Sequence, residues 1–217
     1  MEAHRLALII PAFNEATTIE AVVVGSARFG QPIVVNDCSS DSTAQLAHAA
    51  GAVVVNHSTN LGYDEALNSG FAKAHELGFN YVITLDADGQ HDPALIRRFI
   101  DVFDDGVGLV LGIRSDQARI AEKLFSMYTY LRFGVSDPLC GLKGYKMDLY
   151  RKVGHFDSYR SIGTELMLRS LRSGTKFVQI RFNVKSRLDE PRFGRSISAN
   201  LKILRALWLW LRTSNLN

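Results

Sequence analysis

Two acidic residues, Asp86 and Asp88, stand two positions apart in the segment LDADGQHDP, directly after a short apolar run that ends at Leu85. Carboxylates with this spacing at a strand end can hold a hard divalent cation, because Mg²⁺ takes one or two carboxylates and completes its shell with phosphate and water. Gln90 lies within reach in the same loop. An ordinary turn rich in Asp and Gly would have a similar composition, so the position after a buried strand is what favours a metal site.

A second group of polar side chains, in the segment NDCSSDST, follows the apolar run 33–35. Helix capping explains the Asp and Ser at positions 41 and 42, because such side chains accept hydrogen bonds from free N–H groups at a helix start. Capping does not explain Asp37, whose carboxylate can accept from a base N–H or a ribose hydroxyl. The segment PAFNE at 11–15 follows the first apolar run, and we expect it to form another wall of the same pocket.

These side chains must be positioned by an alternation of short apolar runs and helical stretches. The apolar runs predict strands at 6–10 (ended by Pro11), 33–35, 52–55, 81–85, 107–112 and 177–182, with a turn leading into a short strand over 137–145. The remaining periodicity predicts helices at 17–27, 43–50, 64–77, 94–103, 119–133, 161–173 and 198–213. Apolar strands separated by helices are typical of a mostly parallel sheet with helices on both faces, where ligands bind beyond the carboxyl ends of the strands.

Composition limits the class of protein. The 217 residues are 22% charged and 47% hydrophobic, which fits a single folded domain. The two cysteines exclude a disulfide scaffold and a four-thiolate zinc site, and they fit a reducing compartment. The sequence predicts neither a signal peptide nor a membrane-spanning helix, so we expect a cytoplasmic protein.

Charge is divided unequally between the two halves of the chain. Residues 1–113 carry 5 basic and 14 acidic side chains, a net charge of −9, whereas residues 114–217 carry 20 and 8, a net charge of +12. This asymmetry predicts anionic partners for the C-terminal half, with a merely solvated surface as the alternative. Because no zinc-finger, helix-turn-helix or aromatic-basic RNA signature accompanies it, we expect no nucleic-acid partner.

Taken together and in this order, four segments resemble the inverting glycosyltransferases of family 2: PAFNE, VVNDCSSDST, NLGYDEALNSGFAKA and LDADGQHDP. Four later segments resemble the polyprenyl-phosphate branch of that family, which is like dolichyl-phosphate mannose synthase: RSDQAR, DPLCGLKGYK, GTELMLRSLRSG and KSRLDEPRFGRS. The resemblance implies an α/β fold of GT-A type, with a mostly parallel central sheet flanked by helices. It also implies one domain with a Rossmann-like nucleotide-sugar half (1–113), an acceptor half (114–196) and a C-terminal amphipathic helix (197–217).

The resemblance implies roles for individual residues. The donor, a nucleoside diphosphate sugar, would contact Pro11, Asn14, Glu15, Asp37, Asp86, Arg187 and Arg195. A divalent cation, Mg²⁺ or Mn²⁺, would be held by Asp88 with Gln90 and Asp86. Among the catalytic residues, Asp88 would act through the metal, Arg114 would meet a phosphate, and Asp137 would be a base or an orienting group beside the sugar or acceptor. We expect the basic loop around Arg187 and Arg195 to close over the phosphates.

This chain departs from the family pattern at some positions. Asn36 and Cys38 replace an Asp and a Gly beside the base, and Ile197 stands where the last cation of the basic loop is usual. The leading hypothesis is transfer of a sugar to a polyprenyl phosphate. The alternatives are transfer to a hydroxyl of a glycan or protein, and a non-catalytic module that binds nucleotide sugars. A dinucleotide oxidoreductase is disfavoured, because no G-x-G-x-x-G follows the first strand.

The C-terminal helix has a broad apolar face. At helical spacing this face contains Ile197, Leu201, Leu204, Trp208 and Leu211. Residues 191–217 contain five basic and no acidic residues. The pattern predicts a helix at the surface of an anionic membrane, on its inner face, or against a membrane protein. Packing on the core or between copies of the chain is the alternative.

Overall fold

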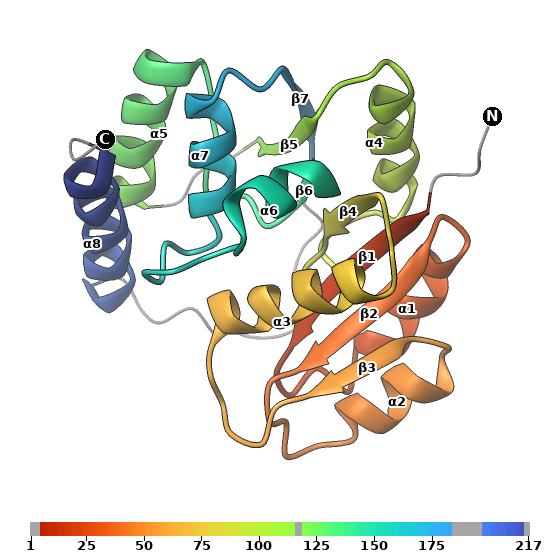
Figure 1. Ribbon diagram of the computed structural model, residues 1–217. Coiled ribbons are helices and arrows are strands. Elements are labelled where there is room, and N and C mark those ends of the chain that lie inside the picture. The colour runs from red at the N-terminus through yellow and green to blue at the C-terminus, as the bar shows by residue number, and fades with distance from the viewer. Residues whose placement is uncertain (1–4, 116–118, 184–196, 215–217) are drawn as a thin grey trace.

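The structure, a computed structural model, describes residues 5–115, 119–183 and 197–214 of the chain. Its centre is a seven-stranded sheet with the order β3-β2-β1-β4-β6-β5-β7 (Figure 1). The strands are β1 (Leu6–Ala12), β2 (Gln31–Asn36), β3 (Val53–Asn56), β4 (Tyr81–Thr84), β5 (Leu109–Arg114), β6 (Lys143–Lys146) and β7 (Phe177–Phe182). Only β6, within this described sheet, runs antiparallel to its neighbours, so the predicted mostly parallel sheet is confirmed.

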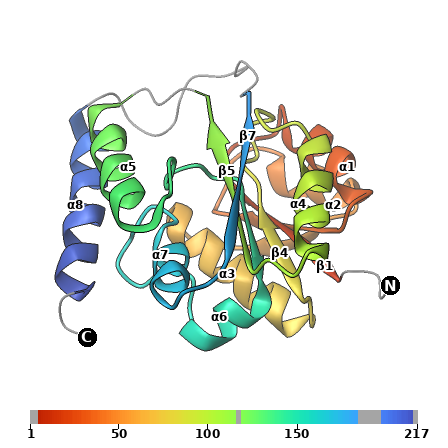
Figure 2. The same ribbon diagram turned by 90° about the horizontal axis from the view of Figure 1, so that it is seen from above.

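Helices cover both faces of the sheet (Figure 2). They are α1 (Ile19–Ala27), α2 (Thr43–Ala49), α3 (Tyr63–Glu76), α4 (Ala94–Asp104), α5 (Ile120–Phe133), α6 (Met147–Val153), α7 (Glu165–Arg172) and α8 (Ile197–Ser214). Side chains alternate along β1, so Leu8 enters a core shared with α1, α2 and α4 while Ile9 enters a core shared with α3 and α5–α8. Both faces of the central strand are therefore buried, which explains its continuous apolar sequence.

The structure shifts several expected boundaries by a few residues, among them β5, which spans Leu109–Arg114 rather than 107–112. Strand β1 continues through Pro11 rather than ending there. The backbone N of Pro11 faces β4, but the pairing of β4 with β1 ends at the bond from Leu85 N to Ile9 O. The missing N–H of Pro11 therefore costs no hydrogen bond of the sheet. Helix α6 was not predicted. Helix α7 begins at Glu165 rather than at 161, because Ile162 and Gly163 have positive φ angles of 58° and 67°, which a helix does not allow.

The strand order brings the expected polar clusters together. Strand β1 lies between β2 and β4, and these three strands are parallel. The segments that follow them therefore leave the sheet at the same edge. A pocket at this edge is built from these three segments, from the start of α3 and from residues of the C-terminal half of the chain.

Candidate active site

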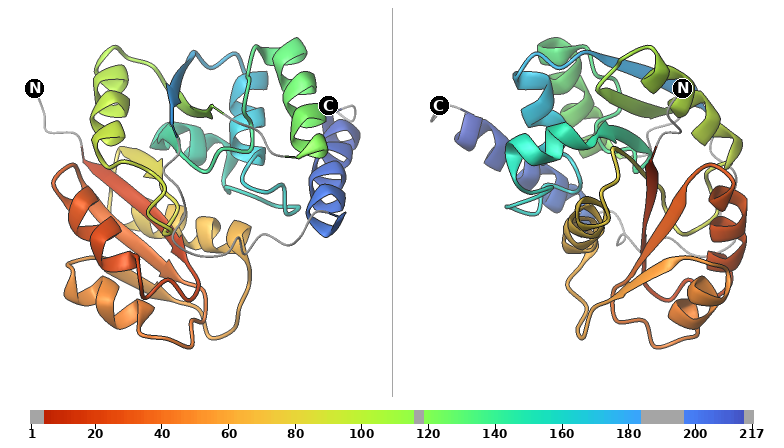
Figure 3. Two further views of the ribbon diagram at one scale, coloured as in Figure 1. Left: turned by 180° about the vertical axis from the view of Figure 1, so that it is seen from behind. Right: turned by 45° about the vertical axis from the view of Figure 1, so that its right-hand side comes forward.

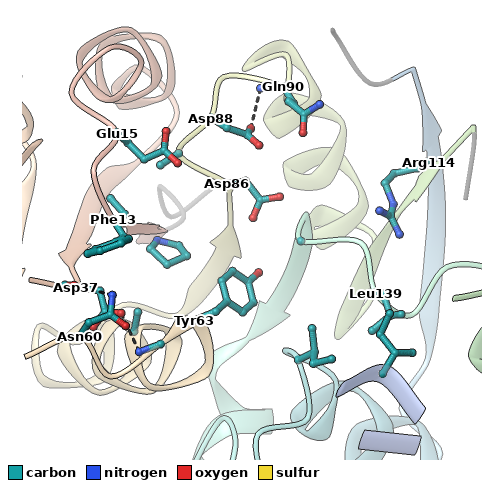
Figure 4. Close-up of a pocket in the computed structure, with 18 of the residues that line it drawn as sticks. Phe13, Glu15, Asp37, Asn60, Tyr63, Asp86, Asp88, Gln90, Arg114 and Leu139 are labelled. Carbon is teal, nitrogen blue, oxygen red and sulfur yellow. Dashed lines mark hydrogen bonds between the residues drawn. The ribbon is translucent and has the colours of Figure 1, made fainter. Parts of the chain in front are cut away.

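A pocket of about 570 Å³ lies at this edge of the sheet (Figure 4). Seven of the residues expected in the site line it: Pro11, Glu15, Asp37, Asp86, Asp88, Gln90 and Arg114. Arg187 and Arg195, the two expected cations of the basic loop, lie outside the described residues. Asn14 and Asp137 support the pocket from behind, as their hydrogen bonds show.

Asn14 ties the first wall of the pocket to the second. Its side-chain oxygen accepts a hydrogen bond from Ser40 N (2.8 Å), and its own N–H donates to the Ser39 hydroxyl (2.9 Å). One residue further on, Glu15 N donates to the Thr43 hydroxyl (2.8 Å), which fixes the direction of the buried Glu15 side chain. The polar residues after β2 thus position the segment after β1. At the start of α2, Asp41 accepts from Thr43 N (3.0 Å), whereas Ser42 makes no side-chain capping bond.

Asp37 is buried and organises a third segment. Its carboxylate accepts hydrogen bonds from Leu61 N and Gly62 N, both at 2.8 Å, and pairs with His57 Nδ1 at 2.7 Å. Its backbone carbonyl accepts from the side chain of Asn60, which also lines the pocket. Asp37 therefore fixes the turn that leads into α3, while its carboxylate still borders the pocket.

Asp86 and Asp88 lie in the middle of the pocket in Figure 4. The side chain of Asp86 is 34% exposed and approaches His91 Nε2 at 3.9 Å, while Asp88 accepts from Gln90 N at 3.0 Å. Gly141 of the acceptor half lies against Asp86 so closely that a Cβ atom there would come within 2.5 Å of both carboxylate oxygens. Only glycine at position 141 therefore leaves room for the Asp86 carboxyl group in this position.

The donor set suits a hard cation. Asp86, Asp88 and Gln90 offer carboxylate and amide oxygens, the atoms that Mg²⁺ and Mn²⁺ prefer. Within residues 5–115, 119–183 and 197–214, no group of three or more His, Cys, Asp or Glu side chains surrounds a possible metal position. A cation here would need phosphate or water oxygens to complete its shell, as Mg²⁺ commonly does.

Two aromatic residues that we did not single out from the sequence also line the pocket. Phe13 is exposed at its rim, and Tyr63 points its ring into it (Figure 4). Desolvation first, and the charge of Asp86 second, raise the pKa of Tyr63, so its hydroxyl stays protonated and can donate a hydrogen bond. Tyr63 stands at the first position of α3, in the segment NLGYDEA, and that position was the available signal.

On the opposite side of the carboxylates, Arg114 is fixed by Asp137. Arg114 Nε donates to Asp137 Oδ2 (2.8 Å) and Nη2 donates to Oδ1 (2.9 Å). Burial alone would lower the pKa of Arg114, but the hydrogen bonds and charge of Asp137 outweigh it and raise this pKa. Asp137 is 1% exposed, so it presents Arg114 to the pocket rather than its own oxygens.

The wall beside Arg114 also includes apolar residues that the sequence did not indicate. They are Leu139, Ile162 of the loop before α7 and Ile203 of α8. The loop is held by Asp157, which accepts from Tyr159 N (3.1 Å) and Arg160 N (2.6 Å), and this fixes the backbone that presents Ile162. The pocket thus has a polar half and a half in which Arg114, Arg119 and Glu122 stand beside apolar side chains.

Comparisons with known proteins agree with this geometry. The family model described as Glycosyl transferase family 2 matches residues 7–160. A polyprenol monophosphomannose synthase of Mycolicibacterium smegmatis is 27% identical, over 69% of this chain and 64% of the relative. An undecaprenyl-phosphate mannosyltransferase of Micrococcus luteus is 25% identical, over 89% of each chain.

A solved structure shows the same fold. The glucosyl-3-phosphoglycerate synthase of Mycobacterium tuberculosis, in complex with Mn²⁺ and uridine-diphosphate-glucose, matches 95% of this chain and 78% of its own with a TM-score of 0.76. The identity is 20%, so this likeness concerns the fold.

Proposed function

This chain belongs to glycosyl transferase family 2 and has the GT-A type of α/β fold, and from that premise we propose that it transfers a sugar from a nucleoside diphosphate sugar to a polyprenyl phosphate. One observation carries the proposal. Asp86 and Asp88 lie between a polar wall with Phe13, on one side, and Arg114 with its apolar neighbours, on the other (Figure 4). A donor and an acceptor of different chemistry can meet at these carboxylates.

The polar half suits the donor. Asp37, Asn60 and Glu15 offer hydrogen-bonding groups for a base and ribose, and Phe13 offers a ring face at the rim. The neighbour of known structure holds a uridine diphosphate sugar, which supports a donor of this class.

Asp88, with Asp86 and Gln90, would hold a divalent cation, Mg²⁺ or Mn²⁺. The complex of the neighbour of known structure with Mn²⁺ supports a cation of this class. Such a cation would stabilise the negative charge of the diphosphate leaving group. The carboxylates would orient the cation, the close approach of Gly141 limits the movement of Asp86, and the protonated Tyr63 hydroxyl could donate to a diphosphate oxygen.

The apolar half suits a lipid-linked phosphate. Arg114 is always cationic and is aimed by Asp137, so it can bind a phosphate, while Leu139, Ile162 and Ile203 can contact the first units of a hydrocarbon chain. Two relatives bear the names of polyprenyl-phosphate sugar transferases. The acceptor phosphate would attack the anomeric carbon as the bond to the diphosphate breaks, on the face opposite the leaving group, and the carbon would invert.

A phosphate acceptor needs no general base, because it is already ionised near neutral pH. A sugar hydroxyl would need one. Asp137 is a poor candidate, since it is buried and bonded to Arg114 through both carboxylate oxygens. We therefore assign Asp137 as the orienting group and favour the phosphate acceptor over a glycan or protein hydroxyl. Asp86 and Asp88, both in the pocket, argue against a non-catalytic module.

A donor and acceptor screen tests the proposal. Nucleoside diphosphate sugars would be incubated with Mg²⁺ or Mn²⁺ and either a short polyprenyl phosphate or free sugars, and products would be identified by mass spectrometry. We expect a glycosylated polyprenyl phosphate whose anomeric configuration, read by NMR, is opposite to that of the donor. Transfer to sugars alone, or retention of configuration, would contradict the proposal.

A further inference from the structure

Most exposed large apolar side chains are concentrated on two helices. Among the described residues, thirteen large hydrophobic side chains are exposed, and nine of them belong to α5 and α8. The α5 members are Ile120, Leu124, Met127, Tyr130 and Leu131, and the α8 members are Leu201, Leu204, Trp208 and Leu211. We name these nine residues the α5/α8 face. Such concentration marks an interaction surface, because single exposed apolar residues are normally scattered.

The α5/α8 face consists of two stripes at helical spacing. On α5, Ile120 and Leu131 (75% and 79% exposed) mark the ends of the stripe. On α8, Leu201 and Leu211 mark its ends. The successive steps of three and four residues keep each stripe on one side of its helix.

Helix α8 uses a different stripe to attach itself. Its buried residues are Ala199, Ile203, Ala206 and Trp210. Trp210 Nε1 donates to the Tyr128 hydroxyl of α5 (3.0 Å), and the Asn200 side chain accepts from Ala121 N (3.2 Å). The face that the sequence predicted for membrane contact is therefore not consumed by packing on the core.

The two stripes point the same way. The contacts of Asn200 with Ala121 and of Trp210 with Tyr128 show that α5 and α8 run side by side in the same direction (Figure 3). With about 3.6 residues per turn, the contact residues of α5 lie about a quarter turn from its stripe in one rotational direction. The contact residues of α8 lie about a quarter turn from its stripe in the other direction. The stripes are therefore neighbours on one surface.

Charge identifies what fits this surface. The sequence of α5 and α8 contains one acidic residue, Glu122, which is buried. It also contains five cations: Lys123, Arg132, Lys202, Arg205 and Arg212. Arg212 lies over the Trp208 ring at 4.7 Å, an arrangement that combines a cation with an aromatic anchor. A second copy of the chain would bring like charges together, whereas an anionic lipid surface would neutralise them.

We propose that the α5/α8 face docks on an anionic lipid bilayer, with α5 and α8 lying in the plane of the interface. No helix among the described residues is long and apolar enough to cross a bilayer. The inference of docking depends on the exposed apolar face and its charge. Its link to the acceptor rests on the proposed function. Ile203 lines the pocket from the inner side of α8, so docking would hold the apolar half of the pocket beside the lipid that carries the acceptor.

Vesicle flotation tests this inference. The full chain would be mixed with vesicles of phosphatidylcholine, with or without phosphatidylglycerol, at low and high salt. We expect flotation with phosphatidylglycerol that weakens as salt rises, because surface charge attraction is screened. Leu131→Gln combined with Trp208→Gln should lower the partition coefficient onto the vesicles about a hundredfold, since each buried side chain contributes roughly one tenfold step and the two steps multiply.

A matched variant controls for general loss of surface apolarity. Val24→Gln replaces an apolar residue of α1 that is 59% exposed and remote from this face, and it should float like the original protein. Circular dichroism and nucleotide binding should be unchanged in all variants. Absence of flotation, equal flotation of the double variant, or a dimer seen by light scattering that the double variant dissociates would overturn the inference. Failure of the sugar-transfer screen would leave the flotation result intact, so the two proposals fail separately.

Discussion

Arg114 and Asp137 form a two-point ion pair in which the backbone N–H of Arg114 also donates to Asp137 Oδ2 (3.1 Å). Three donors from one residue converge on a carboxylate that is almost fully buried. This geometry fixes the plane of the guanidinium, which is what recognition of a phosphate requires. We therefore expect Asp137 to act on the substrate through Arg114, as a positioning residue.

Asp137→Asn should reduce the rate of transfer because Arg114 loses its orientation. It should also destabilise the fold by about 2–3 kcal/mol, somewhat below the loss for a fully buried pair, since the side chain of Arg114 is 25% exposed. Steady-state kinetics across pH would separate the two roles. A positioning residue leaves the shape of the pH profile unchanged, and its effect is not additive with that of Arg114→Ala. Loss of the basic limb of the profile in Asp137→Asn would identify Asp137 as a base instead.

Gly141→Ala should impair the site while sparing the fold. Its Cβ would lie 2.5 Å from both oxygens of Asp86, which must then swing away. We expect metal-dependent nucleotide binding, measured by calorimetry, to weaken about tenfold or more, because one or more charge-assisted contacts are lost. Gly108→Ala is the matched control, since its Cβ would meet only the Thr175 and Leu149 side chains, on the far side of the sheet from the pocket. Equal nucleotide affinity in both variants would show that the position of Asp86 does not depend on the absence of a side chain at Gly141.

Removal of the metal site should abolish transfer. Asp88→Asn keeps the shape of the side chain but removes its charge, and we expect a loss of about a hundredfold or more in kcat, similar to treatment with excess chelator. Asp92→Asn in the same loop is the control, because Asp92 caps α4 through Ala94 N and should affect stability by only about 1 kcal/mol. Full activity of Asp88→Asn in the presence of chelator would show that no cation is needed.

Local sequence patterns predicted the strands and helices of residues 1–113 better than those of residues 114–217. Strand β7 has the predicted bounds, because apolar and polar residues alternate toward the end of Phe177–Phe182, between a glycine turn and a polar segment. The bounds of strand β6 were predicted only roughly, since the strand contains Lys143, and lysine is a residue type that is mostly exposed in proteins. Lys143 is nevertheless buried: its Nζ donates to Gly163 O (3.0 Å), and desolvation lowers its pKa. Such a contact across 20 residues has no local signal.

The orientation of α8 shows the same limit. The stripe with Leu204 and Trp208, which we expected at a membrane surface, is exposed, and a second stripe (Ala199, Ile203, Ala206 and Trp210) faces the core. Small residues allow α8 to approach α5 closely, and Trp210 adds a hydrogen bond to Tyr128. The sequence therefore predicted the helix and one broad apolar face, while the side that packs on α5 depended on the shape of α5.

Asp64 should make stability depend on pH. Desolvation, and the charge of Asp157 after it, raise the pKa of Asp64 to about 6, although Gly163 N donates to it at 2.6 Å. Between about pH 4 and 6 the folded protein holds a proton that the unfolded chain has lost, so stability falls as pH rises through this window. Urea unfolding should show that the stability of Asp64→Asn, relative to that of the original protein, increases by about 2 kcal/mol as the pH rises from 4.5 to 7.5. The matched Asp101→Asn, on the exposed face of α4, should show no such gain, and a flat difference for Asp64→Asn would contradict this reading.

Gly70 marks the closest approach of α3 to the sheet, and Gly70→Ala should destabilise the protein. A Cβ at this position would overlap the Cγ2 methyl of Ile9 in β1, and both residues are buried. Alanine in a helix interior gains about 0.5–1 kcal/mol over glycine, whereas overpacking a core costs about 1–3 kcal/mol. Packing therefore decides the sign, and urea denaturation should show a net loss of about 1–2 kcal/mol. Ile9→Ala removes the opposing methyl, so the double variant should be less destabilised than the sum of the two single variants. Strict additivity would mean that α3 shifts freely on the sheet, and the close contact would then not explain the glycine.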